Sequence, residues 1–143
     1  MIFGIGTDIV EIERINNMNS LDGFVKKILS KNEKQFFENL KDIKKVGYLA
    51  KQFAGKEAIA KAFGTGFTKD IKLSEIEILR DKNGKPFLEP IGSLKQYITD
   101  LGITKTHVSL SDEKEYAIAF AILEKNEEHN FIRSTRSRKR NSS

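Results

Sequence analysis

The sequence contains no cysteine, and this absence excludes several kinds of chemistry. Without cysteine the chain cannot form disulfides, use a thiolate nucleophile or bind zinc through sulfur. The composition fits a reducing compartment. Long hydrophobic runs are also missing, because no run approaches the roughly 20 apolar residues that a membrane-spanning helix needs. The sequence therefore predicts a protein that does not cross a membrane.

The N-terminus, residues 1–6, has neither a basic leader nor a cleavage pattern of the secretory type. We therefore expect a cytoplasmic protein, or an organellar one if a transit peptide precedes the sequence given. With 143 residues, of which 38% are hydrophobic and 31% charged, the chain is long enough for one soluble domain with its own core. We find no internal repeat of the length that solenoid proteins use.

Positive charge is concentrated at the C-terminal end of the chain. The net charge is +5, and residues 125–143 contribute +4 of it through six basic and two acidic side chains. This basic tail has no hydrophobic periodicity, so we expect it to be disordered. It is either an untethered terminus or a segment for targeting or for contact with a polyanion. Because residues 1–124 are nearly neutral, the sequence argues against nucleic-acid binding by the domain itself.

The first half of the chain is predicted to be mostly helical after one strand. Residues 2–10 form an apolar run and are predicted to be a buried strand, with Gly4 and Gly6 suited to the close approach of a backbone or ligand. Glu33 is expected to be solvated on the third of the helices that follow. The periodicity predicts these helices near residues 12–18, 24–29, 32–40 and 43–63, the last of them ending at Gly64.

The second half of the chain is predicted to be mostly strands. They are expected at residues 76–79, from 87, at 107–111 and at 116–123. A hairpin turn is expected over residues 81–86, and a helix over residues 91–101. The continuous apolar run 116–123 predicts a central strand covered on both faces. Residues 1–124 are therefore expected to form one domain.

Four polar residues stand next to apolar or small ones and are candidates for chemistry. Glu57 and Lys61 lie four residues apart on one helical face, where they could also form an ordinary surface ion pair contributing about 0.3–0.5 kcal/mol. Asp8, inside an apolar strand, needs a partner or a metal, unless it caps the following helix. His107 either makes a structural hydrogen bond or contacts a phosphate.

Two carboxylates without cysteine favour a hard cation such as Mg²⁺ over zinc. Magnesium commonly uses one or two protein carboxylates and completes its shell with water and phosphate oxygens. Lys61, one helical turn from Glu57, would add positive charge for a phosphate group. The residues therefore suggest phosphate-ester chemistry, although their spacing alone does not establish that they converge.

Three segments carry a resemblance to a known family. They read GIGTDIVEIERI (residues 4–15), FAGKEAIAKAFGTG (53–66) and HVSLSDEKEYA (107–117). In this order they closely resemble the holo-[acyl-carrier-protein] synthase family, the small 4′-phosphopantetheinyl transferases, and the similarity spans about residues 2–124. The resemblance implies a small single-domain α+β fold, with a long helix packed on an antiparallel sheet, that assembles as a homotrimer with sites between subunits.

The resemblance also implies a reaction. The phosphopantetheine arm of coenzyme A would be transferred to a serine of apo-acyl carrier protein, with adenosine 3′,5′-bisphosphate as the other product. The expected carrier belongs to fatty acid biosynthesis, and a polyketide carrier is also compatible. Asp8 and Glu57 would ligate Mg²⁺, and they would form the catalytic group together with Lys61. Either Lys61 or a held water would take the proton of the serine.

The resemblance further assigns residues to the two substrates. Arg14, on the first helix, would meet the acidic recognition helix of the carrier protein. The nucleotide of coenzyme A would be seated by Lys61, Gly64, Gly66, Lys85, Pro86 and His107.

Two positions depart from the family pattern. Gln52 stands where the family usually has Arg, and the neighbouring Lys51 lacks the fork geometry that Arg offers a phosphate. Asp112 stands where the family often has His, and it would repel a phosphate if that His touches the nucleotide. These departures leave one alternative to the main hypothesis, a catalytically impaired member of the same fold. The basic tail leaves another, a polyanion-binding module that acts through this tail.

Overall fold

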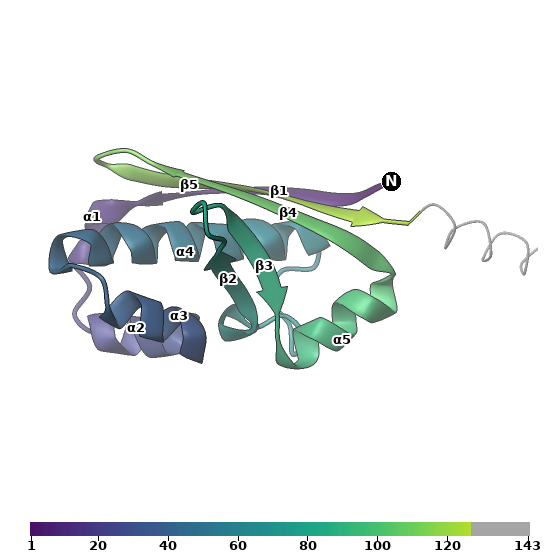
Figure 1. Cartoon of the computed structure of the whole chain (residues 1–143), viewed down its shortest axis with the longest axis horizontal. Helices are drawn as coiled ribbons and strands as arrows, with labels where there is room; N and C mark the ends of the chain where they lie inside the picture. The colour runs from purple at the N-terminus through teal and green to yellow at the C-terminus, as the bar shows by residue number, and fades with distance from the viewer. Residues whose placement is uncertain (127–143) are drawn as a thin grey trace, which may run out of the picture.

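A computed structural model of the chain describes residues 1–126 (Figure 1). The predicted disordered tail falls outside these residues except for its first two positions, and Lys125 is the last residue of a strand. In chain order the elements are β1 (Ile2–Glu11), α1 (Ile12–Asn16), α2 (Leu21–Ile28), α3 (Lys31–Glu38), α4 (Asp42–Phe63), the 3₁₀ turn η1 (Leu73–Glu75), β2 (Ile76–Arg80), β3 (Pro86–Pro90), α5 (Gly92–Leu101), β4 (Ile103–Asp112) and β5 (Tyr116–Lys125). Each predicted helix and strand is present. Among the described residues, no helix is apolar over a length that would span a bilayer.

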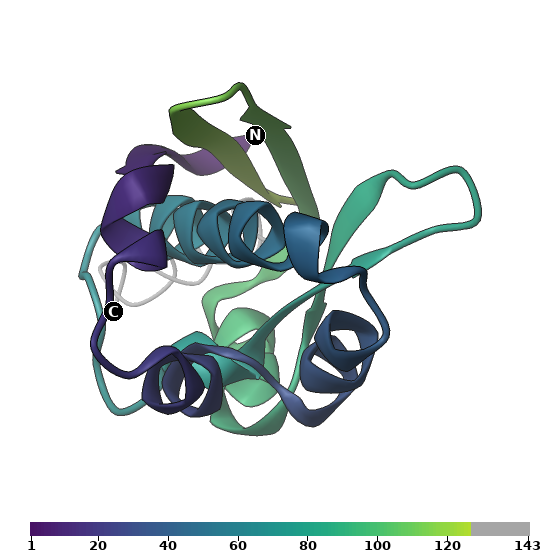
Figure 2. The same ribbon diagram turned by 90° about the vertical axis from the view of Figure 1, so that its left-hand side faces the viewer.

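The domain consists of a sheet, the long helix α4 beneath it, and smaller elements beyond α4. The sheet has the order β1-β5-β4 with both pairs antiparallel, and β2 and β3 form a separate antiparallel hairpin. Figures 1 and 2 both show α4 along one face of the sheet, with α2, α3 and α5 on the far side of α4. The other face of the sheet is not covered by any described part of the chain.

The central position predicted for residues 116–123 is confirmed, but the prediction that both faces are covered is wrong. Ala117, Ala119, Ala121 and Leu123 on β5 are fully buried, whereas the alternate residues Ile118 and Phe120 remain 49% and 40% exposed. Residues 2–10 form the predicted strand, but the prediction that this strand is buried is wrong for one of its faces. Ile5 and Ile9 on β1 are 59% and 64% exposed. The continuous apolar pattern reflects one face against α4 and a second apolar face left open in the single chain.

Small residues allow α4 to lie unusually close to the sheet. A Cβ atom built on Gly4 would overlap the carbonyl oxygen of Ala62, and one on Gly6 would overlap the carbonyl oxygen of Ala58. The prediction that these glycines permit the close approach of a backbone is confirmed. The contact fixes the height of α4 over β1, and with it the distance between residues on their facing sides.

Replacing Gly6 by alanine is expected to destabilise the domain by about 1–3 kcal/mol or more, because neither backbone can move without repacking α4. Gly47→Ala is the matched control in α4, since its Cβ would meet only Asp112 Oδ2 at 3.6 Å. That control is expected to be neutral or stabilising, because alanine is the better helix former. Urea unfolding of both variants measures the difference, and equal stabilities would contradict the close packing.

The β2–β3 hairpin projects from the body of the domain (Figure 2). Its turn is closed by the Asp81 backbone N–H, which donates to the Lys85 carbonyl oxygen at 2.9 Å, and Gly84 supplies the required left-handed conformation at φ +82°. The predicted hairpin turn is therefore confirmed. Lys85 and Pro86 belong to this hairpin, which lies on the side of the domain opposite α1 (Figure 2).

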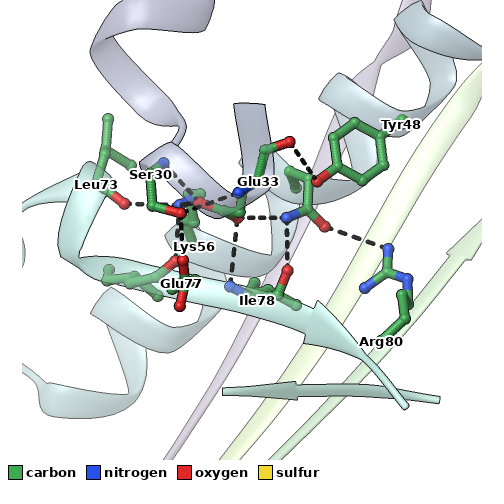
Figure 3. Close-up of polar contacts among 10 residues, drawn as sticks. Ser30, Glu33, Tyr48, Lys56, Leu73, Glu77, Ile78 and Arg80 are labelled. Atoms are coloured by element: carbon green, nitrogen blue, oxygen red, sulfur yellow. Dashed lines mark hydrogen bonds and ion pairs between the residues drawn. The ribbon is translucent and has the colours of Figure 1, made fainter. Parts of the chain in front are cut away.

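A buried polar cluster ties α3, α4 and β2 together (Figure 3). Lys56 of α4 is fully buried, and its Nζ donates to Glu33 Oε1 at 2.7 Å and to the carbonyl oxygens of Leu73 and Ile76 at 2.8 and 2.7 Å. Burial lowers the pKa of Lys56 from its ordinary value, while the adjacent Glu33 carboxylate acts in the opposite direction. The prediction that Glu33 is solvated is wrong, because its carboxylate is fully buried and satisfies Lys56.

Gln52 belongs to the same buried cluster. Its amide nitrogen donates to Glu33 and to the carbonyl oxygen of Ile78, and its amide oxygen accepts from Arg80 Nη2 at 3.2 Å. Gln52 is 0% exposed, so its substitution for the family's arginine is accommodated inside the domain. The second departure is accommodated at the surface, where Asp112 lies 3.6 Å from Lys51 Nζ.

Candidate active site

Asp8 and Lys61 meet where β1 faces α4. Asp8 lies on the side of β1 that also presents Gly6 and Val10, and Lys61 lies in the last turn of α4. Lys61 Nζ donates to Asp8 Oδ1 at 3.0 Å and to the carbonyl oxygen of Thr7 at 3.0 Å. The alternative that Asp8 caps the first helix is wrong, because Asp8 lies inside β1 and the N-cap of α1 is another residue.

Glu57 joins this pair from one turn earlier in α4. Burial and the negative charge of Asp8 raise the pKa of Glu57 above its ordinary value, while Lys61 and Arg14 act in the opposite direction. Asp8, Lys61 and Arg14 thus all lie close enough to Glu57 to affect its carboxyl group. Within residues 1–126, the ion pair of Lys61 is made with Asp8 and not with Glu57. The surface ion pair between Glu57 and Lys61, which their spacing on α4 allows, is therefore not formed among these residues.

The cluster of Asp8, Glu57, Lys61 and Arg14 combines two carboxylates and two cations on three elements, which we call the carboxylate cluster. Asp8 is only 16% exposed, whereas Lys61 is 55% exposed and could turn toward a ligand. No group of three or more potential metal-ligating side chains occurs in the described part of the chain. A site closed by protein ligands alone is thus absent there, but Mg²⁺ needs only one or two carboxylates. Burial and the nearby charge of Asp8 raise the pKa of Glu57. A cation bound between the two carboxylates would favour the charged form of both.

The chain leaves α4 directly beyond the carboxylate cluster. Gly64 ends the helix in the left-handed conformation at φ +81°, and Gly66 follows at φ +71°. The predicted glycine stop is confirmed. No heavy atom lies within 4 Å of the Cβ position of either glycine, apart from their own chain neighbours. The backbone of this turn is therefore accessible one helical turn after Lys61.

His107 does not join the carboxylate cluster within one chain. It pairs with Ile122, which pairs with the exposed Ile5, so these three residues lie on the open face of the sheet. Asp8 pairs with the buried Ala119 on the opposite face. The His107 side chain is 54% exposed, and its Nε2 lies 2.7 Å from a carboxylate oxygen of Glu124. That hydrogen bond lowers the pKa of Glu124.

Lys85 and Pro86 are also separated from the carboxylate cluster. They lie at the base of the β2–β3 turn, where the Lys85 backbone N–H donates to Asp81 Oδ1 at 3.0 Å. Figure 2 shows this hairpin on the side of the domain opposite α1, which carries Arg14. A single chain thus brings together Asp8, Glu57, Lys61 and Arg14 next to the glycine turn, and leaves His107, Lys85 and Pro86 elsewhere.

Sequence reasoning missed Lys56, which anchors the segment of α4 that presents Glu57. A signal was present in the helix pattern. Lys56 lies seven residues after Leu49 and seven before Phe63, so it falls on the buried apolar stripe of α4. A lysine at such a position requires a buried partner. The partner, Glu33, was not identifiable from the sequence because an acidic residue early in a short helix is usually a surface residue.

Two cavities flank α4. One, of about 570 Å³, includes Glu57 in its lining, and the other, of about 440 Å³, lies at the other end of the helix. Lys44, Lys51, Arg80 and Asp112 contribute charged groups to the second cavity. The first cavity therefore adjoins the carboxylate cluster.

Comparison with known proteins agrees with this geometry. The matching family model is that of the 4′-phosphopantetheinyl transferase superfamily, and it covers residues 4–121. A holo-[acyl-carrier-protein] synthase of Wigglesworthia glossinidia brevipalpis is 48% identical over 130 residues, covering 87% of this chain and 94% of that protein. The crystal structure of the holo-[acyl-carrier-protein] synthase from Neisseria meningitidis matches with a TM-score of 0.82 at 39% identity, covering 87% of this chain and 100% of that one.

A holo-(acyl-carrier-protein) synthase from Bacillus anthracis, crystallised in complex with CoA (3′,5′-ADP), matches with a TM-score of 0.75 at 38% identity. The match covers 88% of this chain and 99% of that one. The matched residues include most of β1, all of α1 and α4, which together build the carboxylate cluster, and the glycine turn that follows α4. The chain belongs to the holo-[acyl-carrier-protein] synthase family of the 4′-phosphopantetheinyl transferase superfamily.

Proposed function

We propose that the protein transfers the 4′-phosphopantetheine arm of coenzyme A to a serine of apo-acyl carrier protein. The observation that carries this proposal is the carboxylate cluster, in which Asp8, Glu57 and Lys61 converge beside an open glycine turn. Family membership points to the same reaction, and the Bacillus anthracis relative was crystallised in complex with CoA (3′,5′-ADP).

The reaction exchanges one phosphate ester for another. The serine oxygen of the carrier attacks the β-phosphorus of coenzyme A, and the bond from that phosphorus to the bridging oxygen breaks. Adenosine 3′,5′-bisphosphate leaves with the bond's electron pair, and the serine proton passes to a base. The protein must therefore bind a pyrophosphate, stabilise negative charge on the leaving group and accept a proton.

Asp8 and Glu57 would hold Mg²⁺ at the pyrophosphate. The bound ion would supply positive charge for the phosphoryl oxygens and for the leaving bisphosphate. Lys61 Nζ lies 3.0 Å from Asp8 Oδ1 and its side chain is half-exposed, so we assign it to phosphate contact. The serine proton passes either to Lys61 or to a held water.

The nucleotide half of the site is proposed to be completed by a neighbouring copy of the chain. His107, Lys85 and Pro86, which the family resemblance assigns to the nucleotide, lie away from the carboxylate cluster of their own chain. The open sheet face next to His107 is apolar, as expected of an interface. It carries Ile5, Ile9, Tyr116, Ile118 and Phe120, each at least 40% exposed. We propose a homotrimer assembled through this face.

Replacing Phe120 by glutamate is expected to dissociate the assembly and abolish transfer, because the charge would be buried without a partner in the interface. The Phe120 ring is 40% exposed in the single chain, so the fold itself should tolerate the change. Light scattering measures the mass in solution and circular dichroism checks the fold. An unchanged mass for Phe120→Glu, or a monomeric unmodified protein, would contradict the proposed interface.

Arg14 is proposed to contact the carrier protein. It is exposed on α1 and lies near enough to Glu57 to affect the pKa of that carboxyl. An acidic helix bound at Arg14 would therefore deliver its serine close to the pyrophosphate.

The direct test mixes the protein with coenzyme A, Mg²⁺ and apo-acyl carrier protein. Mass spectrometry of the carrier should show the added mass of one phosphopantetheine arm. An unmodified carrier at every enzyme concentration would overturn the proposed function.

A further inference from the structure

The β2–β3 hairpin is a two-stranded sheet, so within residues 1–126 β2 has a strand partner along one edge only. Ile76 and Arg80 stand opposite Pro90 and Pro86, which have no backbone N–H. These two positions, and Ile78 midway between them, are therefore the ones at which the backbone of β2 points away from β3. Ile76 and Ile78 are buried, so their outward backbone groups need partners other than a strand.

Side chains of α3 and α4 take the place of a second strand beside β2 (Figure 3). Lys56 Nζ donates to the Ile76 carbonyl oxygen at 2.7 Å. The Ile78 backbone N–H donates to Glu33 Oε2 at 3.3 Å, and the Ile78 carbonyl oxygen accepts from Gln52 Nε2 at 3.0 Å. Moving β2 by one residue would turn other backbone groups toward these side chains and break all three contacts. The three side chains therefore fix the register of β2 on α4.

Of these three side chains, Gln52 contacts β2 nearest to the end from which the hairpin projects. Its amide oxygen accepts from Arg80 Nη2 at 3.2 Å, and Arg80 is the last residue of β2. Arg80 pairs with Pro86, and Lys85 directly precedes Pro86. One amide thus holds both the backbone at Ile78 and the side chain that stands opposite the residues assigned to the nucleotide.

We propose that Gln52 is a positioning residue for the nucleotide of coenzyme A. It holds the β2–β3 hairpin on α4 and thereby sets where Lys85 and Pro86 stand. This inference rests on the proposed function, in which those two residues belong to the nucleotide half of the site. Gln52 is 0% exposed between α3, α4 and β2, so it acts through the hairpin and not through contact with the ligand. A hairpin that is already held in place need not be ordered when the nucleotide binds, which strengthens binding.

Gln52→Met tests this assignment, because methionine is similar in length but lacks the amide that contacts Ile78 and Arg80. The KM for coenzyme A is expected to rise about five- to tenfold while kcat changes by less than about twofold, since the hairpin is displaced but the carboxylate cluster is intact. The KM for apo-acyl carrier protein should not change. A purely structural role would instead reduce the fraction of active protein, which lowers the apparent kcat and leaves the KM for coenzyme A as it was.

Gln96→Met is the matched control, because Gln96 is exposed on α5 and donates to Asp100 of the same helix at 2.7 Å. It should leave kcat and both KM values unchanged. Circular dichroism checks the fold, and if Gln52→Met does not fold, Gln52→Asn replaces it with the same expected rise, because its amide is one methylene too short for Ile78.

If the folded Gln52 variant keeps the KM of the unmodified protein for coenzyme A, or raises the KM for both substrates equally, the positioning role is overturned while the proposed function stands. No transfer by the unmodified protein would overturn the proposed function, and this inference with it.

Discussion

Replacing Glu57 by glutamine is expected to lower the rate of phosphopantetheine transfer about 100-fold or more. Glutamine keeps the size of the side chain but removes the negative charge, so only Asp8 of the carboxylate pair remains to hold a cation. Because Glu57 is half-buried on α4 and makes no ion pair among the described residues, the fold should persist. Initial rates of carrier modification, followed by mass spectrometry, measure the effect.

Glu38→Gln provides the control for this experiment. Glu38 is an exposed glutamate at the end of α3, and its contact with Lys34 at 3.9 Å is a weak surface pair. The control should transfer at the unmodified rate. Raising the Mg²⁺ concentration should recover part of the activity of Glu57→Gln, because the weakened site is then better filled. An unchanged rate for Glu57→Gln at low Mg²⁺ would contradict a role in holding the ion.

Replacing Lys56 by methionine is expected to lower the free energy of unfolding by about 3–5 kcal/mol, because it leaves the Glu33 charge buried without its partner. The carbonyl oxygens of Leu73 and Ile76 would also lose their donor. Methionine has a similar length and fits a buried site, so loss of volume is not the cause. Urea unfolding followed by circular dichroism measures the change.

Lys34→Met is the control for the buried pair. Lys34 forms an exposed pair with Glu38 at 3.9 Å, and its replacement should change stability by less than about 1 kcal/mol. A similar small effect for Lys56→Met would show that Glu33 is neutralised or satisfied without Lys56. Since Lys56 also fixes the backbone at Leu73, its replacement should loosen the segment that precedes β2.

Much of the secondary structure was predictable because it depends on local chemistry. Gly64 ends α4 in the left-handed conformation, and Gly84 supplies it in the β2–β3 turn, which are features that a sequence reveals directly. The exposure of the sheet was not predictable in the same way. Ile118 and Phe120 are as apolar as residues of a buried face, and the pattern does not say whether the same chain or another copy covers them.

The candidate site could be predicted only in part from the residues themselves. Spacing placed Glu57 and Lys61 on one face of α4, but the contact of Lys61 with Asp8 joins residues 53 positions apart. The family resemblance grouped these residues, and the structure brings them together. The buried pair of Lys56 and Glu33 was missed. Lys56 stands next to the candidate ligand Glu57, which drew attention away from it, and Glu33 lies in the first turn of a polar helix, where an acidic residue is usually exposed. Partner identity across an interior depends on packing, which periodicity does not encode.

Phosphopantetheine transfer makes two products in equal amounts, and measuring both tests the account most directly. Adenosine 3′,5′-bisphosphate would be quantified by chromatography, and modified carrier by mass spectrometry, in the same reaction with coenzyme A and Mg²⁺. The account predicts one bisphosphate released for each carrier modified, with both products lost in Glu57→Gln. Release of bisphosphate without modified carrier, or no release with apo-carrier present, would contradict it.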